Sequence, residues 1–205
     1  QVNVREDIGL TFAAALRSIL RQAPNIIMIG EIRDMQTATI ATEAALTGHL
    51  VFSTLHTNDA PSAITRLLDI GIRPFLVASS VKAAMAQRLV RNLCPKCKVE
   101  HAPTESEISV LGIKPEEMAG VKLYKSRGCN QCALTGYKGR KGIFEIFKLT
   151  DEIQKMIFEK LPATELRACA RRMGMRSLRE DGLRKVVAGI TTLEEVLRAT
   201  MGDID

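Results

Sequence analysis

Two polar side chains, Glu31 and His56, follow apolar runs that are typical of strands, and this placement predicts a site for phosphate-ester chemistry. Glu31 ends the run Asn25–Glu31, and the run Thr47–His56 carries a histidine near its start and another at its end. Ligands of parallel sheets bind beyond the carboxyl ends of the strands, so we expect both side chains to face one crevice. A carboxylate there can deprotonate a water, and an imidazole beside it can act as a polar donor.

Glu31 also has a structural interpretation, which spacing alone does not exclude. Its carboxylate could pair with Arg33, or with Arg17 or Arg21 on the preceding helical segment. Gly30, directly before it, favours a functional role because a missing side chain gives a ligand room to approach.

The two histidines of the second run are not equivalent. His56 lies among hydroxyl and amide side chains in residues 53–58, and this clustering favours a functional role, although a strand-end histidine can also be a simple polar residue with satisfied hydrogen bonds. His49 lies at the opposite end of the strand, so its position alone favours a structural role.

Four cysteines form two Cys-x-x-Cys pairs, Cys94 with Cys97 and Cys129 with Cys132, and the 31 residues 98–128 separate the pairs. Each pair can offer two thiolates to one ion, and two pairs complete a tetrahedron. Because four protein ligands leave no open position, we expect a structural zinc. Incidental thiols or a redox pair remain the alternatives.

The elements that position these residues follow from apolar periodicity, capping residues and breakers. We expect an α/β fold in which parallel strands are joined by a helical crossover. The predicted strands are Ile26–Ile29, Leu50–Leu55 and Gly142–Leu149, and Gln1–Arg5 is predicted to be a short strand or the end of one. The predicted helices in the first half of the chain are Thr11–Gln22, Met35–Thr47 with Asp34 as its cap, a helix that Asp59 caps and that reaches Ile70, and helical sequence from Pro74 to about Val90. Three more are predicted after residue 150: Asp151 to about Leu161, Thr164–Met173 and Thr192–Thr200. The last of these has a capping pattern formed by Thr191 and Glu194.

Composition limits the class of protein and its partners. Apolar residues make up 46% of the 205 residues and aromatic residues 4%, and the formal charge of +6 suggests an acidic partner such as phosphate, lipid headgroups or an acidic protein face. No run approaches the ~20 apolar residues of a spanning helix, and nothing is typical of a signal peptide. Since no initiator Met is present, we expect the chain to be a piece of a longer protein.

The order of motifs closely resembles that of one family, the ATPases of type II secretion and type IV pilus assembly. The motifs that carry the resemblance cover nearly the whole chain: Gln1–Asn3, Leu16–Gln22, Gly30–Asp34, Leu46–Asn58, Ala86–Arg91, the two Cys-x-x-Cys pairs and Gly136–Arg140. The tetracysteine module resembles the secretion or pilus-extension branch rather than the retraction ATPases.

The resemblance implies the C-terminal part of a RecA-like P-loop NTPase core with a parallel-rich sheet. It implies residues 1–93 as the part of the core that carries Walker B and the His box, residues 94–141 as a zinc-binding tetracysteine subdomain, and residues 142–205 as a C-terminal strand and helical region. The full-length protein would be a homo-hexamer at the cytoplasmic face of the inner membrane. It would use ATP and Mg²⁺ to drive pilin or pseudopilin assembly through a membrane platform protein.

The resemblance also assigns residue roles. Glu31 matches the Walker B glutamate, the expected catalytic base, and His56 would contact the γ-phosphate. The family's His box runs from His49 to His56 and adds His49 to the nucleotide-binding candidates, to which we also assign Arg33. The four paired cysteines match the family's zinc ligands.

One departure from the family pattern concerns nucleotide binding. No Gly-x-x-x-x-Gly-Lys-Ser/Thr occurs in the 205 residues, so the amides and lysine that hold the β- and γ-phosphates are missing. We therefore expect this piece to bind ATP weakly or not at all, and to be inactive alone. The alternative is a zinc-stabilised module that binds a partner or nucleic acid, although scarce aromatics and the lack of a recognition-helix pattern argue against nucleic acid.

Overall fold

The computed structural model describes residues 1–112 and 122–202, and these form two compact units. Unit 1 takes residues 1–84 and 147–175, and unit 2 takes residues 85–146 and those from 176 onward. These two units differ from the three domains that we expect from the sequence, residues 1–93, 94–141 and 142–205. The division into three domains stays a prediction. Short stretches of the last two segments lie outside the described residues.

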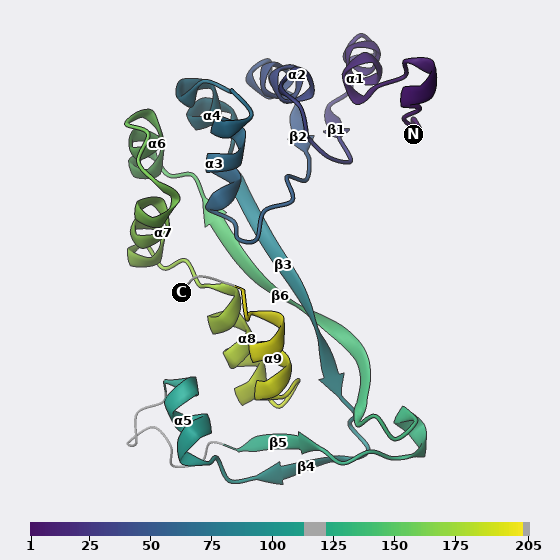
Figure 1. Ribbon diagram of the computed structural model, residues 1–205, viewed down its shortest axis with the longest axis vertical. Coiled ribbons are helices and arrows are strands. Elements are labelled where there is room, and N and C mark those ends of the chain that lie inside the picture. Colours follow the sequence, from purple (N-terminus) through teal and green to yellow (C-terminus); the bar gives the residue numbers. More distant parts are fainter. Residues whose placement is uncertain (113–121, 203–205) are drawn as a thin grey trace. The chain divides into compact units, whose positions relative to one another are not determined.

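The described residues form helices and strands that are joined by turns and loops (Figure 1). The helices are η1 (Glu6–Ile8), α1 (Phe12–Leu20), α2 (Met35–Leu46), α3 (Ser62–Asp69), α4 (Pro74–Ser80), α5 (Glu105–Leu111), η3 (Asn130–Cys132), α6 (Asp151–Phe158), α7 (Ala163–Arg172), α8 (Leu178–Val187) and α9 (Leu193–Ala199). The strands are β1 (Ile26–Met28), β2 (Leu50–Phe52), β3 (Ala83–Leu93), β4 (Lys98–His101), β5 (Leu123–Ser126) and β6 (Tyr137–Lys148). Within the described ranges, no helix has the length and apolar character needed to cross a membrane.

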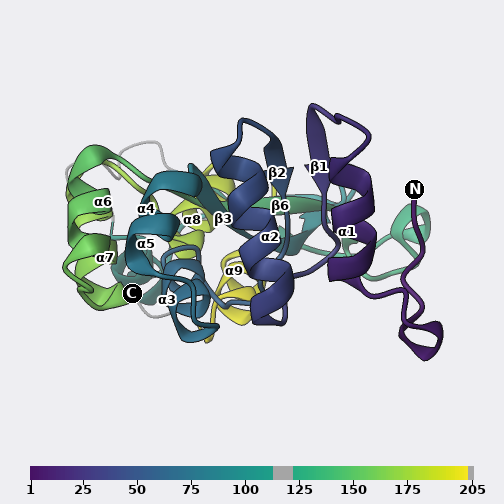
Figure 2. The same cartoon turned by 90° about the horizontal axis from the view of Figure 1, so that it is seen from above.

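In unit 1, β1 and β2 pair in parallel, as the sequence predicts, with Ile26 opposite Leu50 and Met28 opposite Phe52. The crossover between them is α2, which the Asp34 carboxylate caps by accepting hydrogen bonds from the amide and hydroxyl of Thr37, both at 2.8 Å. α1 and α2 pack against each other beside the two strands (Figure 2).

The remaining helices of unit 1 enclose its apolar core. α4 packs against α2 and α6, and α7 packs against α3 and α6. Asp59 caps the start of α3 through the Ser62 amide and also forms an ion pair of 2.9 Å with Arg167 of α7. Both side chains of that pair are about nine-tenths buried. The largest fully buried side chains of unit 1 are Ile64, Val77, Phe147, Ile153, Ile157 and Leu166.

In unit 2, β4 and β5 form an antiparallel pair that packs on α8, and α8 packs on α9. Glu195 of α9 is buried and accepts hydrogen bonds from the backbone amide and the guanidinium of Arg91. Together with a pairing of β3 with β6, the described residues form three two-stranded sheets. Parallel pairing is therefore confirmed for β1 and β2, and a larger parallel sheet stays a prediction.

The prediction of helical sequence from Pro74 to about Val90 is wrong in its second half. α4 ends at Ser80, and residues from Ala83 onward form β3. Two features of the sequence imitate a helix: Ala, Met, Gln, Arg and Leu are good helix formers, and the buried residues Ala86, Val90 and Leu93 recur at helical spacing. Pairing with β6 overrides this local preference.

Helix α8 is absent from the sequence-based prediction, although its capping box, Ser177 with Glu180, is a readable signal. Gly182 in its interior weakens the helical pattern, but the structure explains the glycine. A Cβ there would lie 2.5 Å from Cγ1 of Val196 on α9, so only glycine permits this close packing.

Two predictions near the ends of the chain also need correction. Gln1–Arg5 is not a strand; only an isolated bridge joins Arg5 to Leu10. The cap of α9 is Thr192, which accepts from the Glu195 amide, rather than Thr191, whose hydroxyl donates to the Arg91 carbonyl.

We predict that Gly182→Ala lowers the free energy of unfolding by up to about 2 kcal/mol. Overpacking lowers the free energy of unfolding by about 1–3 kcal/mol, and the better helix propensity of alanine raises it by about 1 kcal/mol. Denaturant unfolding of the single and double variants tests this. In a Val196→Ala background the same change should be neutral or stabilising, and an equal loss in both backgrounds would contradict the packing explanation.

Candidate functional site

The segments that follow β1 and β2 stay side by side beyond the ends of the strands. The Ile29 amide donates to the Phe52 carbonyl at 2.8 Å, and the Ile32 amide donates to the Thr54 carbonyl at 3.0 Å. These two hydrogen bonds continue the parallel ladder past residue 30, so Glu31 and His56 leave the same end of the strand pair.

Glu31 and His56 are in direct contact. Nε2 of His56 lies 2.9 Å from Oε2 of Glu31, and Nε of Arg33 donates to the same oxygen at 2.7 Å. The Glu31 side chain is 22% exposed and that of His56 69% exposed, so water can reach the pair. His56 has a φ of +49°, a left-handed conformation that is uncommon for a residue with a side chain and turns the chain just after Thr54.

These contacts determine the charge state of the carboxyl group. The hydrogen bond with His56 and the one from Arg33 together outweigh desolvation and hold the pKa of Glu31 below its usual value of 4.5. Glu31 is therefore a carboxylate at neutral pH. Both contacts fall on Oε2, and among the described residues no partner binds Oε1, which leaves that oxygen to accept a hydrogen bond from water.

The structure thus brings Glu31, His56 and Arg33 together. A contact between Glu31 and Arg33 is what we expect if Glu31 has a structural role. Glu31 makes this contact and the contact with His56 at the same time. Arg17 and Arg21 do not pair with Glu31.

His49 lies apart from this group, as its position before β2 predicts. Its Nδ1 lies 2.9 Å from the Ala44 carbonyl and 3.2 Å from the Thr47 hydroxyl, so it ties the start of β2 to the end of α2. A carbonyl can only accept, which assigns the proton to Nδ1.

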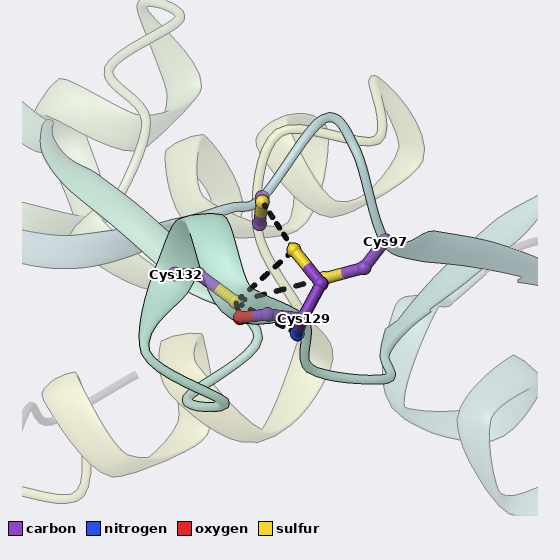
Figure 3. Close-up of side chains that lie close together, drawn as sticks. Cys97, Cys129 and Cys132 are labelled. Atoms are coloured by element: carbon purple, nitrogen blue, oxygen red, sulfur yellow. Dashed lines mark hydrogen bonds between the residues drawn. The ribbon is translucent and has the colours of Figure 1, made fainter.

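The four paired cysteines converge in unit 2, and their sulfur atoms all lie within 4.8 Å of one another (Figure 3). The sulfur–sulfur distances are 3.9 Å for Cys94 and Cys129, 3.8 Å for Cys97 and Cys132, and 3.7 Å for Cys129 and Cys132. A tetrahedral ion with metal–sulfur bonds of about 2.3 Å requires edges of roughly 3.8 Å. Disulfides need about 2.05 Å, so the cluster fits a metal and not a disulfide pair.

The thiols of the cluster differ in acidity. Burial, reinforced by the neighbouring thiols, raises the pKa of Cys97 to about 12. Burial acts in the same direction on Cys132, but hydrogen bonds from the amides of Cys129 and Gly136, both at 3.2 Å, lower its pKa to about 6. Such amide donors stabilise a thiolate, the form that binds a metal.

Unit 2 also contains a pocket of about 260 Å³ whose walls include His101, Glu107, Tyr124, Lys125 and Tyr137. Nε2 of His101 lies 3.1 Å from Oε1 of Glu107. None of the residues that the sequence predicts to be functional lines this pocket, so we assign it no role in the chemistry of Glu31 or of the cysteines.

The α/β fold is shared with ATPases of known structure. It superposes on the crystal structure of the pilus retraction motor PilT with bound ADP with a TM-score of 0.62 and 26% identity, over 93% of this chain and 44% of that one. The ATPase DotB of Legionella pneumophila shares the fold, with a TM-score of 0.61 at 22% identity over 94% of this chain and 42% of that one.

The chain belongs to the family described as type II/IV secretion system protein, whose model matches residues 1–198. It is 54% identical to the type IV pilus assembly ATPase PilB of Thermus thermophilus, over 98% of this chain and 23% of that protein. It is 51% identical to PilB of Myxococcus xanthus (99% and 36%), and 50% identical to the type II secretion system protein E of Pseudomonas aeruginosa (98% and 39%). The chain therefore spans between 23% and 39% of the length of these curated relatives.

We predict one tetrahedrally bound metal ion per chain, held by the four paired cysteines. Elemental analysis of the purified protein should give a stoichiometry near one, and Cys132→Ser should lower both this value and the thermal stability. Cys169→Ser is the matched control, because Cys169 is also buried but lies outside the cluster. Metal retained at full stoichiometry in Cys132→Ser would contradict the assignment.

Proposed function

We propose that the chain is the C-terminal part of a RecA-like motor ATPase that hydrolyses ATP to power type II secretion or type IV pilus assembly. The contact between Glu31 and His56 at the ends of two adjacent parallel strands is the observation that carries this proposal. Family membership and the names of the relatives support the same function.

In the proposed reaction, Glu31 orients a water for attack on the γ-phosphate. The new bond forms between the water oxygen and phosphorus, the bond to the β,γ-bridging oxygen breaks, and Oε1 of Glu31 accepts the proton that the water loses. The guanidinium of Arg33 and the imidazole of His56 are exposed beside the carboxylate and can donate hydrogen bonds. In this proposal they contact the phosphate oxygens. His49 is the weaker candidate for such a contact, because its Nδ1 already bonds Ala44.

Nucleotide binding in this proposal requires residues beyond these 205. The chain contains no phosphate loop, and Glu31 with two donors does not form a cage for Mg²⁺, which binds chiefly through phosphates and waters. We propose that the 205 residues alone bind ATP weakly and are inactive, and that the motor works as a homo-hexamer on an inner-membrane platform protein at the cytoplasmic face.

An exposed apolar surface supports the proposal of a larger core. One face of the β1–β2 pair exposes Ile26, Met28, Leu50 and Phe52, while Ile27 on the other face is buried. Soluble proteins seldom leave such a contiguous patch uncovered. We propose that further segments of the ATPase pack on this face.

Zinc is the ion that we assign to the cysteine cluster. Four thiolates at tetrahedral spacing are typical of structural zinc sites, and the set leaves no position for substrate. The ion would cross-link the start of β4 to the turn around η3 and thereby stabilise unit 2.

In an ATPase that carries this segment together with a phosphate loop, we predict that Glu31→Gln lowers kcat by at least about 100-fold, the range expected for removal of a general base. ATP binding should be retained, because glutamine keeps the shape of the side chain. Steady-state turnover and calorimetric ATP binding give the two readouts. Glu43→Gln, on the exposed face of α2, is the matched control, and the 205-residue chain is the control for binding without a phosphate loop. Turnover that survives in Glu31→Gln would show that the assigned role is wrong.

A further inference from the structure

Thr54 lies between the end of β2 and His56, and it contacts the residues on both sides of Glu31. Its hydroxyl donates a hydrogen bond of 2.7 Å to the Gly30 carbonyl, and its own carbonyl accepts one of 3.0 Å from the Ile32 amide. We propose that Thr54 is the positioning residue that holds Glu31 against His56. Its effect on turnover rests on the function proposed above, whereas its effect on the geometry of the pair does not.

The side-chain hydrogen bond has a specific geometric consequence. The Gly30 carbonyl and the Glu31 amide belong to one planar peptide group, so fixing the carbonyl also fixes the direction in which the chain enters Glu31. Glycine is the residue least able to fix this direction by itself, because it has the widest range of backbone conformations. The Thr54 hydroxyl therefore supplies an orientation that the backbone at residue 30 does not.

The same residue restrains the chain on the His56 side. Two positions after Thr54, His56 adopts its left-handed backbone conformation, which is unfavourable for a residue with a Cβ and persists only where the surroundings hold it. Anchoring Thr54 to residues 30 and 32 fixes the point from which this turn begins. One residue, Thr54, thus helps to position both members of the pair. Its hydroxyl bonds the carbonyl before Glu31, its main-chain carbonyl accepts from Ile32, and its backbone leads into the turn at His56. Nε2 of His56 lies 2.9 Å from Oε2 of Glu31.

The experiment compares three variants. Thr54→Val removes the hydroxyl donor with little change in shape, and Thr54→Ser restores the donor. Thr39→Val is the matched control, because the Thr39 hydroxyl also donates to a main-chain carbonyl at 2.7 Å, that of Met35, but within α2.

The first readout is the titration of the Glu31 carboxyl in the 205-residue chain, followed by carbon-13 NMR of the side chain. The hydrogen bond with His56 holds this pKa below 4.5, so loss of alignment should move the midpoint upward, toward 4.5, in Thr54→Val. Thr54→Ser and Thr39→Val should titrate like the wild type. A wild-type midpoint in Thr54→Val would overturn the proposal, as would an equal shift in Thr39→Val.

The second readout is turnover in the longer ATPase. A misplacement of about 1 Å can cost roughly 100-fold in rate, so we expect kcat to fall between about tenfold and 100-fold in Thr54→Val with KM for ATP unchanged. Thr54→Ser should recover the rate, and Thr54→Val should cause no further loss in a Glu31→Gln background. If the NMR midpoint moves while kcat does not, the positioning role stands and the catalytic role of Glu31 is wrong.

Discussion

The parallel pairing of β1 and β2 is the constraint on which the candidate site depends. Glu31 and His56 are 25 positions apart in the sequence, and α2 is the crossover that returns the chain so that both follow their strands at the same end. Hydrogen bonds from Ile29 and Ile32 carry the pairing past the strands themselves. Without that continuation, the two short segments would have many arrangements, and few of them would bring an imidazole nitrogen within hydrogen-bond distance of a carboxylate oxygen.

The Glu31–His56 pair and the cysteine cluster differ in burial and in what stabilises their charge. The Glu31 carboxylate is accessible to water, and hydrogen bonds with His56 and Arg33 hold its pKa below the usual value. The cysteine cluster is largely buried, and its sulfur atoms stand at the spacing of a closed tetrahedron, so it is suited to hold an ion permanently. The first centre lies in unit 1 and the second in unit 2.

The sequence predicts those features that local chemistry decides. Asp34 and Asp59 accept hydrogen bonds from the helix starts that follow them, and the cysteine spacing correctly predicts a four-thiol cluster. Features that depend on distant partners escape prediction. β3 is rich in helix-forming residues, and it is a strand because it pairs with β6. The close approach of Val196 explains Gly182, the residue that weakens the helical pattern of α8. The hydrogen bond from the Thr54 hydroxyl to the Gly30 carbonyl joins residues 24 positions apart, and no local sequence pattern predicts it.

Amide hydrogen exchange at Ile32 tests the central geometry most directly. Ile32 lies outside β1, so its amide would exchange rapidly if the segment after the strand were free, whereas a hydrogen bond to Thr54 should protect it. We predict that NMR exchange measurements on the 205-residue chain show Ile32 protected to a degree similar to Ile29, whose amide bonds Phe52 within the same ladder. Exchange of Ile32 at the rate of an unstructured peptide, with Ile29 still protected, would contradict the account.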